Sequence, residues 1–260
     1  MDLNNIKCKV VELEKLQDKI QSNFNTSSDL IDANEWAELL VAATKDSYNK
    51  IGKVYAEVRS YEMSDLDKRV WDKLLYHIEK QLGKDYQNIR LLDVGTGSGR
   101  DIIYASKLGF DCVGVDNSDV FISILENLER EHLIPKKSFV KADMRDLPFD
   151  DNSFDVVRQH MSLLHLPIVT KGYMADKAIQ ENHRILKENG LLYVFAKKGT
   201  GIHYIDTNEG LGGRIFQYYD DNSIRNLLER NGFEILEIMD EQENRNDEII
   251  NLIMAIARKR

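Results

Sequence analysis

The stretch LLDVGTGSG, residues 91–99, decides the fold that this sequence predicts. A short apolar run leads into three glycines at alternate positions, and residues 101–108 continue with the spacing of a helix. Glycine at such positions lets the backbone turn sharply and lets a ligand lie directly against main-chain atoms. The stretch therefore predicts a strand, a ligand-binding turn and a helix in direct succession.

On the C-terminal side, strand patterns alternate with helical ones, which is typical of a doubly wound parallel sheet. The polar segment 240–248 is too short for a helical crossover, so we expect the last two strands to pair antiparallel. The result is an α/β fold with a seven-stranded, mostly parallel sheet whose last strand is antiparallel. Strands are expected at 89–94, 111–116, 138–142, 154–157, 191–195, 233–239 and 249–257, and helices at 101–108, 120–131, 175–187 and 221–230.

The N-terminal part of the chain has a helical pattern instead. We expect an amphipathic helix within residues 1–22, a second at 34–48 and a third between Ser64 and Gly83. Residues 1–82 are therefore predicted to form a helical extension or lid, and residues 83–260 the main domain that binds the ligand. Within the extension, we expect the segment from about residue 30 to residue 82 to pack over the carboxyl end of the sheet and to close the acceptor pocket. The stripe in residues 1–22 fits packing on the same chain or on a second subunit, as in a homodimer.

Composition narrows the class of protein. Thirty-five lysines and arginines against 44 aspartates and glutamates give a net charge of −9, which disfavours non-specific binding to nucleic acid or to an anionic membrane. No apolar run approaches the ~18 residues of a membrane span, and the N-terminus lacks a signal-peptide pattern. Only Cys8 and Cys112 occur, and the six histidines lack metal-ligand spacing, so we expect a cytoplasmic protein without a metal site.

The glycine pattern separates two cofactor families. A dinucleotide fingerprint, G-x-G-x-x-G, would require glycine at position 100, where Arg100 stands. The run D-x-G-x-G-x-G from Asp93 to Gly99 instead resembles the class I S-adenosylmethionine-dependent methyltransferases, which have a Rossmann-like fold. Over residues 48–258 further pieces agree in order, namely VD at 115–116, ADMRDLPF at 142–149, SFDVV at 153–157, LHLP at 164–167 and RILKENGLL at 184–192.

The resemblance implies a cofactor site for S-adenosyl-L-methionine, with S-adenosyl-L-homocysteine as the product. Asp93 would organise the loop and reach the methionine amino group, and Asp116 would hold the ribose hydroxyls. The other contacts implied are the backbone at Gly95, Thr96 and Gly97, Asn117, Asp143 and Met144 around the adenine, a backbone carbonyl at Arg158 or Gln159 for the amino group, and Tyr48 and Tyr55 over the cofactor.

Each acidic residue also has a structural interpretation that the sequence leaves open. Asp93 is able to cap its loop, Asp116 to cap the following helix, and Asp143 to close a turn with Arg145.

The acceptor end is less defined. Methyl transfer needs mainly alignment, and a general base only when the acceptor is a hydroxyl or an acidic carbon. His160 and His165 are the candidate catalytic residues, and packing is the competing interpretation for both. The glycines between residues 199 and 213 suggest a mobile loop over the acceptor, or a plain surface excursion.

The leading hypothesis is a methyltransferase that acts on a small-molecule acceptor. The alternatives are an NAD-dependent oxidoreductase on a Rossmann sheet and a methyltransferase-like module that binds the cofactor without catalysis. The sequence does not identify the acceptor or the atom that is methylated.

Overall fold

The computed structural model describes residues 27–58, 61–83, 85–169, 173–206, 213–245 and 248–260. The helix predicted within residues 1–22, and with it the question of a dimer, lies outside the described residues. Within them, no helix is both long enough and apolar enough to cross a bilayer.

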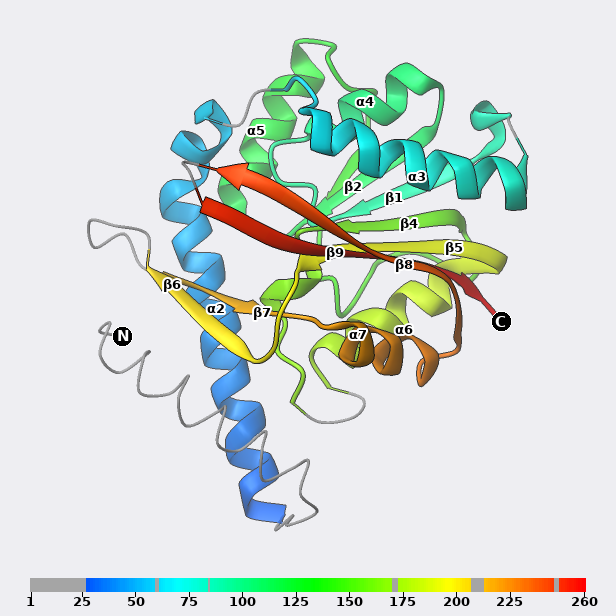
Figure 1. The fold of residues 1–260 in the computed structure, drawn as a ribbon. Helices are drawn as coiled ribbons and strands as arrows, with labels where there is room; N and C mark the ends of the chain where they lie inside the picture. The colour runs from blue at the N-terminus through cyan, green and yellow to red at the C-terminus, as the bar shows by residue number, and fades with distance from the viewer. Residues whose placement is uncertain (1–26, 59–60, 84, 170–172, 207–212, 246–247) are drawn as a thin grey trace.

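A seven-stranded sheet forms the centre of the molecule (Figure 1). Its strand order is β3-β2-β1-β4-β5-β9-β8, and β9 runs antiparallel to both of its neighbours. This confirms the predicted sheet. The strands are β1 (Arg90–Val94), β2 (Asp111–Asp116), β3 (Phe139–Lys141), β4 (Phe154–His160), β5 (Leu186–Lys197), β8 (Phe233–Arg245) and β9 (Glu248–Lys259).

Helices cover both faces of this sheet (Figure 1). One face carries α3 (Asp65–Leu82), α4 (Arg100–Leu108) and α5 (Asp119–Arg130), and the other carries α6 (Ala175–Ile185) and α7 (Asp221–Glu229). Successive side chains of a strand point to opposite faces of the sheet, so Leu91 packs in one hydrophobic cluster and Leu92 in the other. Two 3₁₀ helices, η1 (Tyr86–Asn88) and η2 (Leu163–His165), complete the connections.

The two described N-terminal helices lie in different places. Helix α2 (Ser27–Val58), which is longer than predicted, runs beside α5 and β7 (Figure 1). Helix α3 begins at a capping box between Ser64 and Asp67 and ends before Gly83, as predicted. It buries Val70 and Trp71 against the sheet. Helix α3 therefore covers one face of the sheet and does not only lie over the carboxyl ends of the strands. The division of the chain into two domains at residue 82 stays a prediction.

The glycine-rich segment after β5 contains ordered structure that the sequence did not predict. Strands β6 (Ile202–Asp206) and β7 (Gly213–Gln217) pair antiparallel in a separate two-stranded sheet. Ile202 and Ile215 are almost fully buried, and the Ile215 amide donates to Thr44 Oγ1 of α2 at 3.1 Å. The predicted mobile loop is therefore wrong for residues 202–206, which form a strand, because pairing with β7 and apolar packing order them. Residues 207–212 lie outside the described ones, so the prediction is not tested there.

Candidate functional site

A cavity lies at the carboxyl ends of β1, β2 and β4, and α2 forms part of its wall. This is the edge at which doubly wound sheets bind their ligands. Most of the predicted site residues line it, while Asp93, Arg158 and Gln159 are buried outside the lining. The predicted residues in the lining are Tyr48, Tyr55, Gly95, Thr96, Gly97, Asp116, Asn117, Asp143, Met144, His160 and His165.

The glycine turn leaves room for a ligand. Gly95 has φ +75°, and a Cβ there would lie 2.3 Å from the Ser162 Cβ, so the close approach of the two segments requires glycine. Gly97 has φ +56°, and a Cβ there would meet nothing within 4 Å. The main chain at Gly97 is therefore open to the cavity, as a bound cofactor requires.

Asp116 is held in place by the backbone. Its Oδ2 accepts the Gly97 amide at 2.9 Å, and its Oδ1 accepts the Ser118 amide at 2.9 Å. Burial raises the pKa of Asp116, and these backbone bonds partly offset the effect. Ser118, not Asp116, caps α5, since its side chain accepts from the Phe121 amide. A carboxylate offers about four lone-pair sites, so Asp116 keeps acceptor capacity for a further donor.

Asp143 closes its turn with Arg145, as one of its two sequence interpretations proposed. Arg145 donates through Nε to Oδ1 at 3.0 Å and through Nη2 to Oδ2 at 2.7 Å. Burial opposes ionisation, but these bonds outweigh it and lower the pKa of Asp143. Arg145 also donates to Glu38 of α2 at 2.9 Å, so the turn that presents Met144 to the cavity is tied to that helix.

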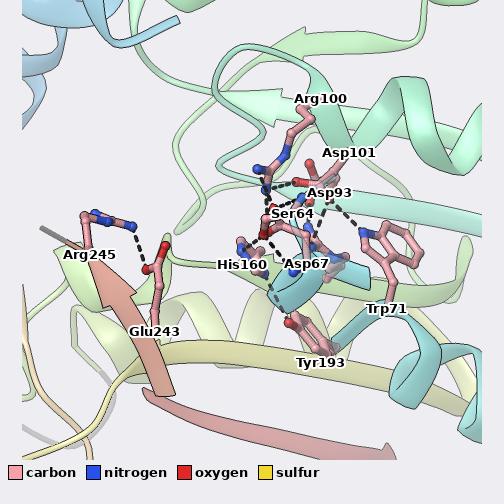
Figure 2. Close-up of polar contacts among 11 residues, drawn as sticks. Ser64, Asp67, Trp71, Asp93, Arg100, Asp101, His160, Tyr193, Glu243 and Arg245 are labelled. Atoms are coloured by element: carbon pink, nitrogen blue, oxygen red, sulfur yellow. Dashed lines mark hydrogen bonds and ion pairs between the residues drawn. The ribbon is translucent and has the colours of Figure 1, made fainter. Parts of the chain in front are cut away.

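A buried ion network lies behind the turn (Figure 2). Arg158, with 1% of its side chain exposed, donates to Asp93 at 3.0 Å and lies 3.1 Å from Asp101. Its guanidinium lies 4.7 Å from the centre of the Trp71 ring, and Trp71 Nε1 donates to Asp101 at 2.8 Å. Burial raises the pKa of Asp93 above its usual range, against the pull of Arg158. The pKa of Asp101 stays well below its usual range despite burial, because nearby cations, Arg158 first, outweigh it.

The carboxylate that faces the cavity is therefore not the one that the sequence predicted. Asp93 binds Arg158, whereas Asp101 lines the cavity. Sequence reasoning missed Asp101, although its place at the start of α4, directly after the glycine turn, was a usable signal. Gln159 is fully buried and its Nε2 lies 3.9 Å from the Met144 sulfur.

His165 is held as a neutral ring in one tautomer. Its Nδ1 lies 2.8 Å from the Ile215 carbonyl oxygen, which only accepts, so Nδ1 carries the proton. Nε2 therefore accepts from the Tyr48 hydroxyl at 2.9 Å, and that hydroxyl accepts from Arg214 Nη1 at 3.2 Å. Burial lowers the pKa of His165 to about 4, and the charges of Arg214 and Lys197 also lower it. Burial raises the pKa of Tyr48 to about 12.

His160 is oriented by different partners (Figure 2). Its Nδ1 lies 3.1 Å from the Tyr193 hydroxyl, and its ring stacks on Phe195 at 4.9 Å. Its Nε2 lies 3.7 Å from Asp67, which Arg100 holds through two bonds of 2.9 Å.

A second cavity adjoins the first, and both are lined by Arg100, His160 and Met161. It extends to the end of the β8–β9 hairpin, where Arg245 donates to Glu243 at 2.7 Å (Figure 2). The two arginines that line this second cavity, Arg100 and Arg245, thus both have carboxylate partners.

Comparison with known proteins agrees with this arrangement. Residues 92–194 match a family model described as a methyltransferase domain. A sterol 24-C-methyltransferase of Kluyveromyces lactis is 33% identical over 174 residues, which are 63% of this chain and 45% of that protein. The chain spans less than half the length of the first such relatives.

Solved structures share the fold. A SAM-dependent methyltransferase of Methanosarcina mazei has a TM-score of 0.58 at 23% identity, over 70% of this chain and 96% of that one. A 1,6-didemethyltoxoflavin-N1-methyltransferase of Burkholderia thailandensis, with its substrate and S-adenosylhomocysteine bound, has a TM-score of 0.55 at 18% identity, over 74% and 81%.

The family match covers the glycine turn, Asp116 and the strand that ends at His160, so it includes the cavity wall except for the part that α2 forms. Residues 92–194 therefore form a methyltransferase domain, and the fold around it is one that solved SAM-dependent methyltransferases share.

Proposed function

We propose that this protein transfers a methyl group from S-adenosylmethionine to a small-molecule acceptor by in-line displacement. The observation that carries the proposal is the Asp116 carboxylate, which the Gly97 amide fixes beside an open glycine turn at the sheet's carboxyl edge. A carboxylate so placed is suited to two ribose hydroxyls. The cofactor supplies an activated methyl group, and the protein supplies position and exclusion of water.

The other cofactor contacts are assigned by their place in the cavity. Asn117, Asp143 and Met144 lie where an adenine next to the ribose would reach. Asp101, rather than Asp93, is the carboxylate in the lining near the methionine end, so we assign the amino group to Asp101, with Asp93 and Arg158 fixing its environment. Tyr48 and Tyr55 bring α2 over the cavity as a cover.

The two histidines take different roles in this proposal. His165 uses both ring nitrogens to hold the Ile215 carbonyl and the Tyr48 hydroxyl, so it positions Tyr48. His160 lines both cavities and is placed to orient the acceptor between them.

The acceptor class rests on chemistry and on the names of relatives. The matched proteins methylate a sterol carbon and a toxoflavin-precursor nitrogen, according to their names, so small organic acceptors fit while the atom stays open. The net charge of −9 argues against a nucleic-acid acceptor. A cytoplasmic location stays a prediction.

Calorimetry with S-adenosylhomocysteine, S-adenosylmethionine and NAD tests the first step. We expect both sulfur compounds to bind and NAD not to bind. Binding of NAD alone would favour the oxidoreductase alternative. Mass spectrometry of a broad acceptor panel tests transfer, and cofactor binding without any methylated product would favour the non-catalytic module.

A further inference from the structure

Two cations near the cavity lack the carboxylate partner that comparable cations have. Arg100, Arg145 and Arg158 are mostly buried, and each forms an ion pair. Lys197 and Arg214 are also half-buried, yet no ion pair joins either of them to any carboxylate of the described residues. Burying a charge without a partner is costly, so such a pair requires a reason.

Aromatic rings hold these two cations close together. Lys197 Nζ lies 4.4 Å from the centre of the Phe216 ring, and the Arg214 guanidinium carbon lies 5.5 Å from the same ring centre. Arg214 also lies 5.0 Å from the Tyr48 ring, and Lys197 donates to the Tyr218 hydroxyl at 3.3 Å. Both charged groups therefore lie against the same ring, that of Phe216.

The pair lies behind the wall of the first cavity, in contact with Tyr48 of its lining, and neither cation is itself in that lining. Arg214 donates to the hydroxyl of Tyr48, which lines the cavity beside His165. Lys197 is the last residue of β5, two residues after Phe195, which pairs in register with His160. One cation thus approaches from β7 and the other from β5.

The local field is positive although the protein is acidic. Burial lowers the pKa of Lys197, and repulsion from Arg245 and Arg214 lowers it further. The Nε of Arg214 is buried and has no hydrogen-bond partner. A group that brings negative charge and acceptor oxygens would satisfy both residues.

We propose that Lys197 and Arg214 bind an anionic group, a carboxylate or a phosphate, on the methyl acceptor. This rests on the proposed methyl transfer, because it assigns the acceptor's charge at the same site. The anion lies against Phe216 and Tyr48, and it holds the rest of the acceptor toward His160 and the first cavity. Arg100 and Arg245 serve as structural contrasts, since carboxylates of the protein already neutralise them.

Calorimetry with simple probes tests the charge preference. The protein is saturated with S-adenosylhomocysteine and titrated with benzoate, phenyl phosphate, benzamide and benzylamine. We expect benzoate or phenyl phosphate to bind about tenfold or more tightly than benzamide, because hydrogen bonds to charged groups are the strong ones. The preference between the two anions distinguishes carboxylate from phosphate.

Variants locate the effect. Lys197→Met and Arg214→Met should each weaken anion binding about tenfold, Arg214→Lys should weaken it less, and Lys197→Glu should favour benzylamine over benzoate. Arg225→Met is the matched control, because Arg225 is an exposed cation on α7 that pairs within its own helix. A thermal unfolding scan of each variant verifies the fold.

Equal binding of benzoate, benzamide and benzylamine would overturn the proposal, and so would unchanged selectivity in both methionine variants. The same panel is titrated without S-adenosylhomocysteine. If S-adenosylhomocysteine fails to bind while the anion preference persists, the proposed function fails and the anion site stands. If it binds and the preference is absent, only the anion site fails.

Discussion

Two groups of cations in this molecule contrast sharply. Arg158 is fully buried between β1, β4 and α4, and carboxylates of the chain hold its guanidinium on two sides. Lys197 and Arg214 are only half-buried, and aromatic rings and hydroxyls surround them instead of carboxylates of the described residues. The same residue types therefore occur once with their charge balanced internally and once with it unbalanced.

The difference indicates two kinds of role. A buried charge that other residues of the chain balance contributes to the native structure, and removing it leaves its partners uncompensated. A charge that is left unbalanced near a cavity lowers stability, and its retention is typical of sites that bind ligands. The two groups should thus respond to mutation with opposite signs in stability.

The largest effect is expected for Arg158→Met. It leaves Asp93 and Asp101 buried without their main cation, and breaking a buried ion pair costs about 3–5 kcal/mol of the free energy of unfolding. Urea unfolding measures the loss. Arg258→Met is the control, because Arg258 pairs with Glu234 at a more exposed site, where about 1 kcal/mol or less is expected. Equal losses in the two variants would contradict a structural role for Arg158.

The next effect concerns binding rather than stability. Asp116→Ala removes the carboxylate assigned to the ribose, and two unpaired hydroxyls would cost roughly 2–3 kcal/mol of cofactor binding. We expect S-adenosylhomocysteine affinity to fall about 30- to 150-fold in calorimetry. An unchanged dissociation constant in a folded variant would place the cofactor elsewhere.

Local sequence patterns predicted most of the fold. The alternation of apolar runs with helical spacing yielded the seven strands, and the short polar link after Met239 correctly predicted the antiparallel pair. The limits of β8 were set too early, because its outer end is polar and its pairing with β9, not its own composition, continues the strand to Arg245. Local pattern also missed β6 and β7, because the two strands pair with each other and β7 bonds to the distant helix α2.

The site was less accessible to sequence reasoning, because its decisive contacts join distant residues. Arg158 and Asp93 are 65 positions apart, and Tyr48 and His165 are 117 apart. The motif identified Asp93 as a cofactor contact, but only the structure reveals that Arg158 occupies it and that Asp101 lines the cavity.

A smaller effect, of opposite sign, is expected at the unbalanced pair. Lys197→Met or Arg214→Met removes repulsion between like charges and keeps most of the apolar contact with Phe216. The free energy of unfolding should rise by up to about 1 kcal/mol or stay unchanged. Urea unfolding at low ionic strength measures the change, which high salt should reduce. A loss comparable to that of Arg158→Met would assign these cations to the structural group.

The last prediction concerns the pH dependence of stability, which the buried His165 ring governs near the same two cations. The pKa of His165 is about 4 in the folded protein against 6.5 ordinarily, so between these values the unfolded chain binds more protons than the folded one. The contribution of His165 to stability is therefore complete above pH 6.5 and is lost as the pH falls toward 4. Comparing the stability of wild type and His165→Gln across this pH range separates the contribution of His165 from that of Asp93, whose raised pKa acts in the opposite direction.

¹⁵N NMR of the His165 ring gives the midpoint of its titration directly. Because the charge of Arg214 helps to lower this pKa, Arg214→Met should move the midpoint upward, while Arg225→Met should not. A wild-type midpoint near 6.5 would mean that the ring is solvated and that the unbalanced cations do not act on it.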